Sequence, residues 1–301
     1  MSRALVPLFS ALGHVPTSLA AGAGRTAGHL TGLFPSGSKE QLIKNHQRLA
    51  DFPLGNDHVR RAFASYFEMF AQTPSLHRWS EQKIRSSVDA TNQEQLLEAL
   101  EQGPVVVAMT HSGNWDLAGA WANYELGKVV TVAEVLQPPE LYDYFVKTRQ
   151  SLGMEILPAK RGIFDTLREQ VKGRNVLVPL LADRDITGSG VEVDFGGHRA
   201  LVAAGPAALA KQLDAPLWVN HMSSKRDQHG LKYTLNLHPV ETTGDVEADT
   251  QAWVDAVVPL IQTNLADWHM LQPLFVDDLD QERLARARER HARSAEETGE
   301  Q

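Results

Sequence analysis

The sequence predicts an α/β fold: a single mostly parallel sheet flanked by helices, with a helical subregion at the amino terminus. Two observations support this prediction. From about residue 92 to residue 265, short apolar runs alternate with helical patterns of about 10–15 residues. Before residue 92, the chain shows mainly helical patterns. Strands that alternate with helices are typical of crossover units around a parallel sheet.

The first third of the chain is expected to be helical. Apolar residues at three- and four-residue spacing in 4–15 form one helical stripe. Further helices are expected over 39–51 and 56–74, and Pro74 ends the second of these. The glycines of 20–32 have the spacing GxGxxxG with no strand before them, which favours close helix packing over a dinucleotide-binding loop.

The remaining elements alternate, as this fold class requires. The run VVVAMT at 105–110 is almost entirely apolar, which is typical of a buried parallel strand. The expected strands are 105–110, 129–133, 155–158, 175–181, 191–195, 216–223 and 231–237. The expected helices are 92–102, 115–126, 139–152, 162–172, 203–213 and 247–265.

One domain is expected, and its three parts differ in charge. They are the helical subregion over 1–85, an α/β core over 86–276, and a charged carboxyl-terminal helix and tail over 277–301. The first part has ten basic and five acidic residues, a charge of +5, whereas the rest has 19 basic and 32 acidic residues, a charge of −13. With a net charge of −8, this asymmetry favours an anionic membrane surface as partner, not nucleic acid. A solvated surface of uneven charge is the alternative.

The composition excludes several classes of protein. The chain has no cysteine, which removes disulfide scaffolds, thiolate nucleophiles and cysteine-ligated metals. No stretch approaches the ~18 continuous apolar residues of a membrane-spanning helix. Residues 4–15 fit a helix in a membrane interface or a helix packed on the body, and a signal peptide is disfavoured by the breaks at Gly13 and Pro16.

The segment THSGNWD at 110–116 is the strongest candidate for a catalytic site in the sequence. His111 directly follows the strand 105–110, and Asp116 begins the next helix. Catalytic groups of open α/β sheets gather at the carboxyl ends of strands. A histidine there, oriented by an aspartate, can take a proton from a hydroxyl group that then attacks a carbonyl carbon. His46 and Asp51 have the same spacing without a preceding strand, so we interpret that pair as a surface coincidence.

THSGNWD resembles the HxxxxD motif of the glycerolipid acyltransferase superfamily. It most resembles the branch with the lipid A lauroyl and myristoyl acyltransferases and the actinobacterial phosphatidylinositol mannoside acyltransferases. The resemblance covers roughly residues 56–276, although FGGH at 195–198 replaces the common Phe-Phe-Gly. Four further blocks agree in order: SLGMEILPAKRGIFDTLRE at 151–169, LLADRDITGSGVEVDFGG at 180–197, AAGPAALAKQLDAPLWV at 203–219 and DWHMLQPLF at 267–275.

The resemblance implies transfer of a fatty acyl chain, such as palmitoyl, from acyl-CoA to a mannose hydroxyl of a phosphatidylinositol mannoside. It implies a peripheral protein on the cytoplasmic face of the cell membrane, with no permanently bound cofactor and no metal. His111 would be the general base and Asp116 would orient it. The backbone N–H groups of Gly113 and Asn114 would stabilise the oxyanion. In the simpler interpretation, Asp116 only caps the helix 115–126.

Further polar residues match active-site positions of that branch. Glu134 would bind sugar hydroxyls, and Arg149 would hold a CoA phosphate or the charge of the acceptor. An ion pair between these two residues is the alternative. Arg161 would bind phosphate at a helix start, or it is simply solvated.

The block ADRD supplies a second acid, which would hydrogen-bond the acceptor or His111. We expect Asp185 in that role, with Asp183 and Arg184 as a structural pair, and the inverse assignment stays open. His221 and His238 lie in or beside expected strands, and we expect no role for them.

Two other functions remain open at this stage. The acceptor can be another lipid-linked saccharide, such as a lipid A precursor, with acyl carrier protein as the donor. The chain can also be a catalytically silent lipid-binding protein on the same fold.

Overall fold

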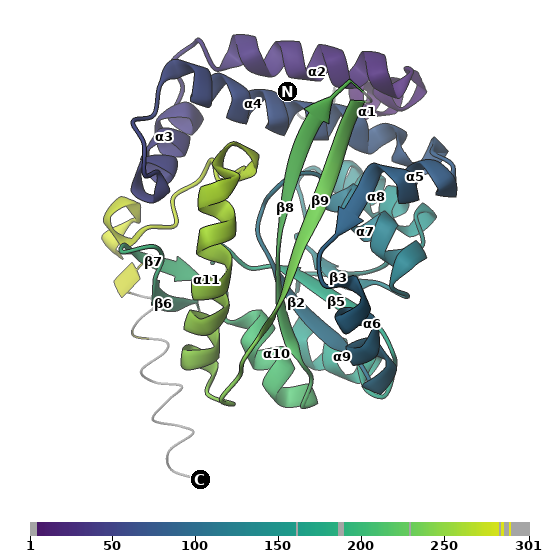
Figure 1. The fold of residues 1–301 in the computed structure, drawn as a ribbon, viewed down its shortest axis with the longest axis vertical. Coiled ribbons are helices and arrows are strands. Elements are labelled where there is room, and N and C mark those ends of the chain that lie inside the picture. The colour runs from purple at the N-terminus through teal and green to yellow at the C-terminus, as the bar shows by residue number, and fades with distance from the viewer. Residues whose placement is uncertain are drawn as a thin grey trace.

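The computed structural model describes residues 5–160, 162–185, 190–228, 230–282, 284–285 and 289. A sheet forms its centre and helices lie on both faces (Figure 1). Five strands are hydrogen-bonded in the order β1 (Val88–Ala90), β9 (Gly230–Val240), β8 (Leu217–Asp227), β2 (Val105–Met109), β5 (Leu177–Leu181). Beyond β5 lie β3 (Val130–Ala133) and β4 (Glu155–Pro158), joined to it by a bridge from Val129 to Leu177. A separate hairpin consists of β6 (Val191–Asp194) and β7 (Arg199–Val202).

The predicted fold class is confirmed. In the central sheet and its extension, neighbouring strands are parallel except for β8 and β9. These two strands form a hairpin that is longer than predicted and reaches the amino-terminal helices (Figure 1). Its polar outer end is held there because Arg226 on β8 pairs with the buried Glu68. Periodicity missed this end since the side chains are not apolar.

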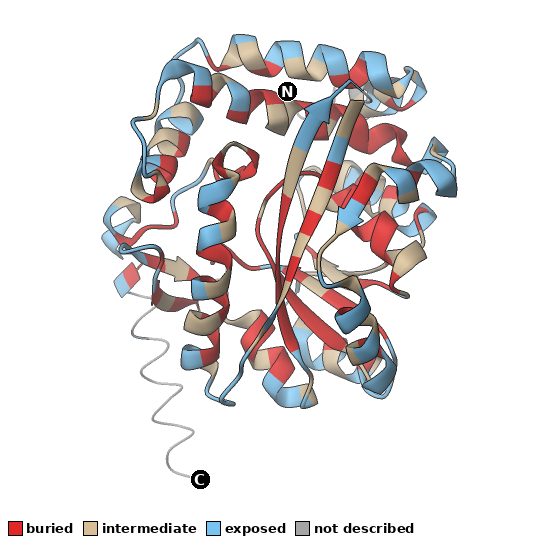
Figure 2. Ribbon diagram, in the orientation of Figure 1, coloured by how far each residue is buried: buried red, intermediate tan, exposed pale blue. Residues whose placement is uncertain are grey.

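Helices cover the two faces of the sheet with two separate hydrophobic clusters. The strand β2 is buried along its whole length (Figure 2). Its Val106 and Ala108 face one cluster, and Val105 and Val107 face the other. Behind the first cluster lie α9 (Ile163–Val171), α10 (Gly205–Leu213) and α11 (Val246–Thr263). Behind the second lie α5 (Glu81–Ser87), α6 (Gln93–Gln102) and α7 (Trp115–Glu125). The remaining helix of this part of the chain, α8 (Pro139–Ser151), connects β3 to β4.

The amino-terminal subregion is helical, as predicted. It contains α1 (Leu5–His14), α2 (Thr17–Thr31), α3 (Gly37–Leu49) and α4 (Asn56–Gln72). The Phe9 ring of α1 packs against Phe70 and Phe145, so this helix rests on the body of the protein. Within the described ranges, no helix has both the length and the apolar character needed to cross a membrane.

The structure also contains three short 3₁₀ helices among the described residues: η2 (Thr73–Arg78), η3 (Leu265–Asp267) and η4 (Val276–Asp278). The helix predicted within 277–301 lies largely outside the described residues.

The small residues of α2 allow it to lie directly on α4. A Cβ atom at Gly28 would be 2.3 Å from the Phe63 carbonyl oxygen, and one at Gly24 would be 2.7 Å from the Phe67 carbonyl oxygen. Both obstacles are backbone atoms, which cannot rotate away. The predicted role in close helix packing is therefore confirmed for Gly24 and Gly28, and it is wrong for Gly22, where a Cβ has no neighbour within 4 Å.

We expect Gly28→Ala to lower the free energy of unfolding by about 1–3 kcal/mol, because the added methyl group must push the two helices apart. Gly22→Ala is the matched control on the same helix, since a Cβ there has no neighbour within 4 Å. The control should be neutral or gain up to about 1 kcal/mol from helix propensity. Urea unfolding of both variants measures the difference, and equal losses would contradict the packing explanation.

Candidate active site

His111 lies in the loop between β2 and α7, at the carboxyl edge of the sheet, as predicted. Asn114 fixes the far end of this loop because its side-chain oxygen accepts a hydrogen bond from the Leu117 N–H. Gly113 has a φ of +56°, and a Cβ there would be 2.7 Å from the Met222 side chain. Only glycine fits this position. The His111 side chain remains 28% exposed and therefore accessible to a ligand.

A buried carboxylate, that of Asp183, holds the imidazole of His111. Asp183 Oδ1 lies 2.5 Å from His111 Nδ1, and Oδ2 accepts hydrogen bonds from the His111 backbone N–H at 2.9 Å and the Trp268 indole N–H at 2.8 Å. Burial raises the pKa of Asp183, but the charge and hydrogen bonds of His111 and the bond from Trp268 outweigh it, so the net shift is downward.

An ionised Asp183 selects the tautomer of His111 with its proton on Nδ1. The other ring nitrogen, Nε2, has no hydrogen-bond partner within the described part of the chain. This nitrogen therefore carries a lone pair that can accept a proton from a bound hydroxyl group.

The predicted contact between Asp116 and His111 is wrong. Asp116 pairs with Arg149 instead: its Oδ1 lies 2.5 Å from Arg149 Nε, and its side chain is only 3% exposed. Asp116 lies in the first turn of α7, and its side chain is directed toward Arg149 in the last turn of α8 and not toward His111. The side chain that caps α7 is that of Asn114, not Asp116.

Of the two aspartates in ADRD, the structure places the one that was the alternative choice, Asp183, against His111. The expectation for Asp185 is therefore wrong, and among the residues that the structure describes no ion pair joins Asp183 to Arg184. Asp185 is also buried, and its backbone N–H donates to the Leu201 carbonyl of β7. The reason is sheet geometry, since Asp183 follows β5 at the same distance as His111 follows the neighbouring strand β2.

The predicted oxyanion donors are already occupied. The Gly113 N–H donates to the Asp267 carbonyl at 3.0 Å, and the Asn114 N–H donates to the Met222 sulfur at 3.2 Å. Neither can bind an incoming oxygen without first breaking that bond.

The other predicted binding residues are dispersed. Glu134 is exposed just after β3, and its alternative pairing with Arg149 is wrong because Arg149 binds Asp116. Arg161 lies outside the described residues.

Sequence reasoning gave no role to the segment 267–269, which closes the site from behind. Its Trp268 pairs with Ser112 in an isolated antiparallel bridge, and the His269 N–H donates to the His111 carbonyl at 2.7 Å. Residues 267–269 belong to DWHMLQPLF at 267–275, one of the blocks that carry the family resemblance. Their local sequence pattern does not indicate a contact with His111.

Buried histidines surround this core. His46 was predicted to be a surface residue, which is wrong: it is fully buried, its Nε2 donates to the Trp268 carbonyl, and its Nδ1 lies 2.9 Å from His58 Nε2. Burial lowers the pKa of His46 to about 3, and that of His269 also to about 3. It lowers the pKa of His221 to about 4. These three histidines are therefore neutral at neutral pH.

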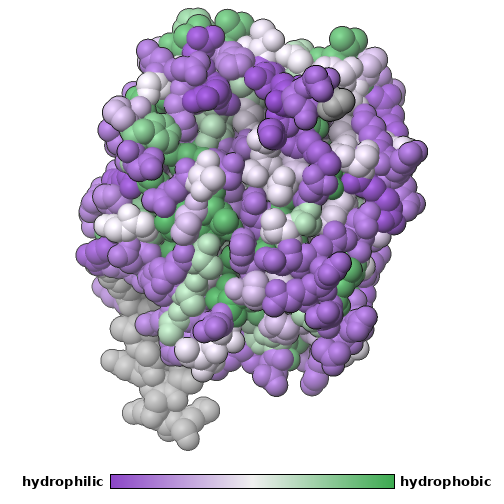
Figure 3. Space-filling view, viewed as in Figure 1, coloured by the Kyte–Doolittle hydropathy of each residue, from purple (hydrophilic) through white to green (hydrophobic). Residues whose placement is uncertain are grey.

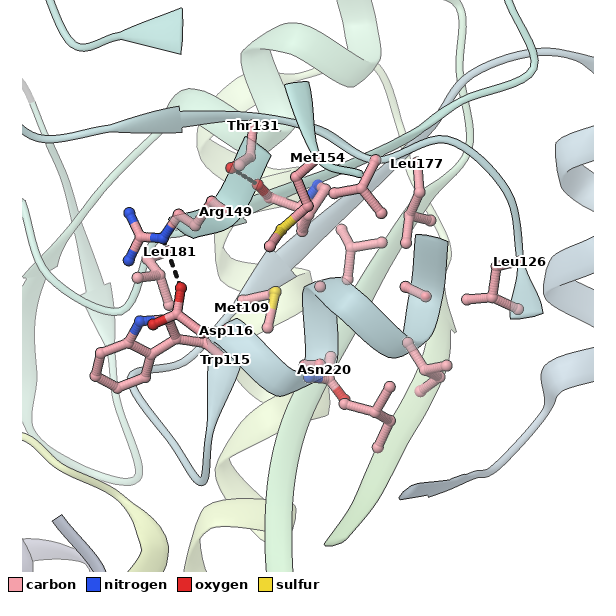
Figure 4. Close-up of a pocket in the computed structure, with 18 of the residues that line it drawn as sticks. Met109, Trp115, Asp116, Leu126, Thr131, Arg149, Met154, Leu177, Leu181 and Asn220 are labelled. Atoms are coloured by element: carbon pink, nitrogen blue, oxygen red, sulfur yellow. Dashed lines mark hydrogen bonds and ion pairs between the residues drawn. The ribbon is translucent and has the colours of Figure 1, made fainter. Parts of the chain in front are cut away.

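An apolar pocket opens beside His111, between α7 and the face of the sheet. Its walls are mainly apolar side chains, among them Met109, Met154 and Leu177. Trp115 lines the pocket and also meets the His111 ring edge-on at a centroid distance of 5.7 Å. Figure 4 shows Trp115 together with the Asp116–Arg149 pair at one end and Leu126 at the other. The pocket therefore suits an apolar ligand group, with the polar Asp116–Arg149 pair at the end near Trp115.

Comparison with known proteins identifies the family. The model of the bacterial lipid A biosynthesis acyltransferases matches residues 4–276. A phosphatidylinositol mannoside acyltransferase of Mycolicibacterium smegmatis is 39% identical over 258 residues, which are 83% of this chain and 84% of that protein. Proteins of the same name from two strains of Mycobacterium tuberculosis are 37% identical over 265 residues, 84% of this chain and 82% of theirs. This chain is therefore an acyltransferase that belongs to the bacterial lipid A biosynthesis acyltransferase family.

Proposed function

We propose that this acyltransferase moves a fatty acyl chain from acyl-CoA to a mannose hydroxyl of a phosphatidylinositol mannoside. The names of its relatives support the acceptor. The observation that carries the proposed chemistry is a histidine with Nδ1 bound to a buried carboxylate and Nε2 open, at the mouth of an apolar pocket.

In the proposed mechanism, His111 Nε2 takes the proton of the mannose hydroxyl as its oxygen attacks the thioester carbonyl carbon. The C–O bond forms, the C–S bond breaks, and the CoA thiolate leaves with the proton returned by the imidazolium. Asp183 stabilises the imidazolium while it exists. No metal is required in this scheme, because a thioester is already activated and a thiolate is a good leaving group.

The pocket would bind the acyl chain so that the thioester lies near Trp115. Arg149 uses its Nε to bind Asp116, and its terminal nitrogens have no hydrogen-bond partner within the described residues. We therefore assign Arg149 to an anionic or oxyanionic part of the substrates at the mouth of the pocket. Glu134, exposed at the same edge of the sheet, is assigned to the sugar hydroxyls.

The experiment that tests this function follows both products with purified protein and palmitoyl-CoA. We expect free CoA and an acylated mannoside in equal amounts when the acceptor is a phosphatidylinositol mannoside. Phosphatidylinositol without mannose is the matched control and should give no acylated product. Transfer only to a lipid A precursor, use of palmitoyl acyl carrier protein alone, or binding of lipid without turnover would overturn the proposal.

We also propose that the protein works at the cytoplasmic face of the cell membrane as a peripheral protein. Large apolar side chains are exposed on α2 and just after it, namely Leu19, Leu30, Leu33 and Phe34. Figure 3 shows hydrophobic residues at this end of the molecule, which α2 forms in Figure 1. A helix with an apolar outer face beside a basic subregion suits the interface of an anionic bilayer.

We expect the protein to sediment with vesicles that contain anionic phospholipid, and added salt to weaken this binding because it screens charge. The double variant Leu30→Glu with Leu33→Glu should release the protein, since it places charge on the apolar face. Gln102→Glu on α6, exposed and distant from α2 in Figure 1, is the control and should not. Equal binding to neutral and anionic vesicles would contradict the electrostatic part of the proposal.

A further inference from the structure

The segment 267–269 is bound to the His111 loop by several main-chain contacts. The Gly113 N–H donates to the Asp267 carbonyl at 3.0 Å, and the His269 N–H donates to the His111 carbonyl at 2.7 Å. His269 Nε2 lies 3.1 Å from the Gly113 carbonyl oxygen and donates to it. These bonds flank the isolated antiparallel bridge between Ser112 and Trp268, so hydrogen bonds join the main chains of the two segments on either side of Trp268.

Ring stacking and a hydrogen bond fix the position of Trp268. Its side chain is fully buried, and its ring stacks against those of Phe195 and His46, each at an interplanar angle of 13°. Its carbonyl oxygen accepts a hydrogen bond from His46 Nε2 at 2.9 Å. The direction of the indole N–H is therefore fixed by packing before any substrate binds.

That indole N–H is directed at Asp183 Oδ2 at 2.8 Å. Asp183 is completely buried, so protein groups must provide its hydrogen bonds. Without Trp268, Oδ2 would keep only the main-chain bond from His111, and the carboxylate could rotate about its Cβ–Cγ bond. Rotation would move Oδ1 away from His111 Nδ1.

We infer that Trp268 is a positioning residue: its indole N–H holds the Asp183 carboxylate in the orientation that keeps His111 Nε2 directed at the substrate. This inference rests on the proposed function, in which His111 is the general base. Trp268 does not line the apolar pocket, so its effect on the reaction acts through Asp183 and not through contact with the acyl chain.

Trp253 provides a matched control within the same hydrophobic cluster. It is fully buried like Trp268, but its indole N–H has no hydrogen-bond partner among the described residues. Replacement of either tryptophan by phenylalanine removes a similar volume from the same core. Only Trp268→Phe also removes a bond to a carboxylate.

The test compares Trp268→Phe with Trp253→Phe. Loss of a hydrogen bond to a charged group predicts a kcat about 10- to 100-fold lower for Trp268→Phe, with the KM for acyl-CoA unchanged. Trp253→Phe loses core packing but no hydrogen bond, so it should lower the melting temperature no more than Trp268→Phe does and leave kcat unchanged. Equal effects of the two variants on kcat, or a loss that appears only in KM, would overturn the inference.

A second measurement needs neither substrate nor a folded Trp268 variant. With ¹⁵N-labelled tryptophan, the Trp268 indole resonance should shift in Asp183→Asn relative to the wild type, whereas the Trp253 resonance should not move. An unmoved Trp268 resonance would overturn the inference. If the resonance shifts but the wild type transfers no acyl group, the proposed function fails while the bond between Trp268 and Asp183 stands.

Discussion

Replacement of His111 by alanine is expected to lower kcat by about 10²- to 10⁴-fold, the usual contribution of a general base. The fold should persist, because the His111 side chain is partly exposed and packs mainly against Trp115 at the pocket mouth. The KM for acyl-CoA should change little, since His111 does not line the apolar pocket. Steady-state assays with the same acceptor measure both constants.

The control is His238→Ala, a half-buried histidine on β9 that should leave kcat unchanged. His46→Ala is unsuitable, because His46 is buried and bonded to the Trp268 carbonyl, so its loss would disturb the site indirectly. Full activity of His111→Ala would exclude the proposed mechanism.

The second large effect is expected for Asp183→Asn, with a loss in kcat of up to about 10⁴-fold. Asparagine keeps the shape of the side chain but loses the charge that stabilises the imidazolium, and its amide group can favour the wrong tautomer of His111. The double variant with His111→Ala should be hardly worse than His111→Ala alone, because Asp183 acts through His111. Independent and additive losses would show that Asp183 has a separate function.

Asp116→Asn is the informative comparison, because it alters the aspartate of the HxxxxD motif. It weakens the bond to Arg149 and should mainly lower stability and substrate affinity at the pocket mouth. We expect a much smaller loss of kcat than for Asp183→Asn. The opposite order would return the orienting role to Asp116.

Most of the order of the elements could be predicted from the sequence, because the longer strands and helices have a clear hydrophobic period. The prediction missed α5, β1 and β7, which are too short to show one. His111 could be found because it follows a buried strand. Its partner could not, since the prediction depended on spacing along the chain and not on pairing between strands. The register pairs Met109 with Leu181, and two residues beyond these lie His111 and Asp183. Equal offsets from the ends of adjacent parallel strands were the available signal.

His46 shows a second limit of pattern reading. The lack of a preceding strand predicts a surface residue, and this prediction is wrong. However, the buried residues Leu42, Asn45, His46 and Leu49 follow helical spacing, and the amphipathic pattern of α3 therefore contained the correct answer. Trp268 had no such signal, because its contact with Asp183 joins residues 85 positions apart.

The contact between Trp268 and the His111 loop has a consequence for biosynthesis. The ribosome makes the chain from the amino terminus, so His111 and Asp183 emerge long before residues 267–269. Until that last segment emerges, the Gly113 N–H and the His111 carbonyl lack their partners and Asp183 lacks its indole donor. A nascent chain, or one truncated before residue 267, thus holds the motif without an assembled centre, and competence arises only after residues 267–269 have been synthesised.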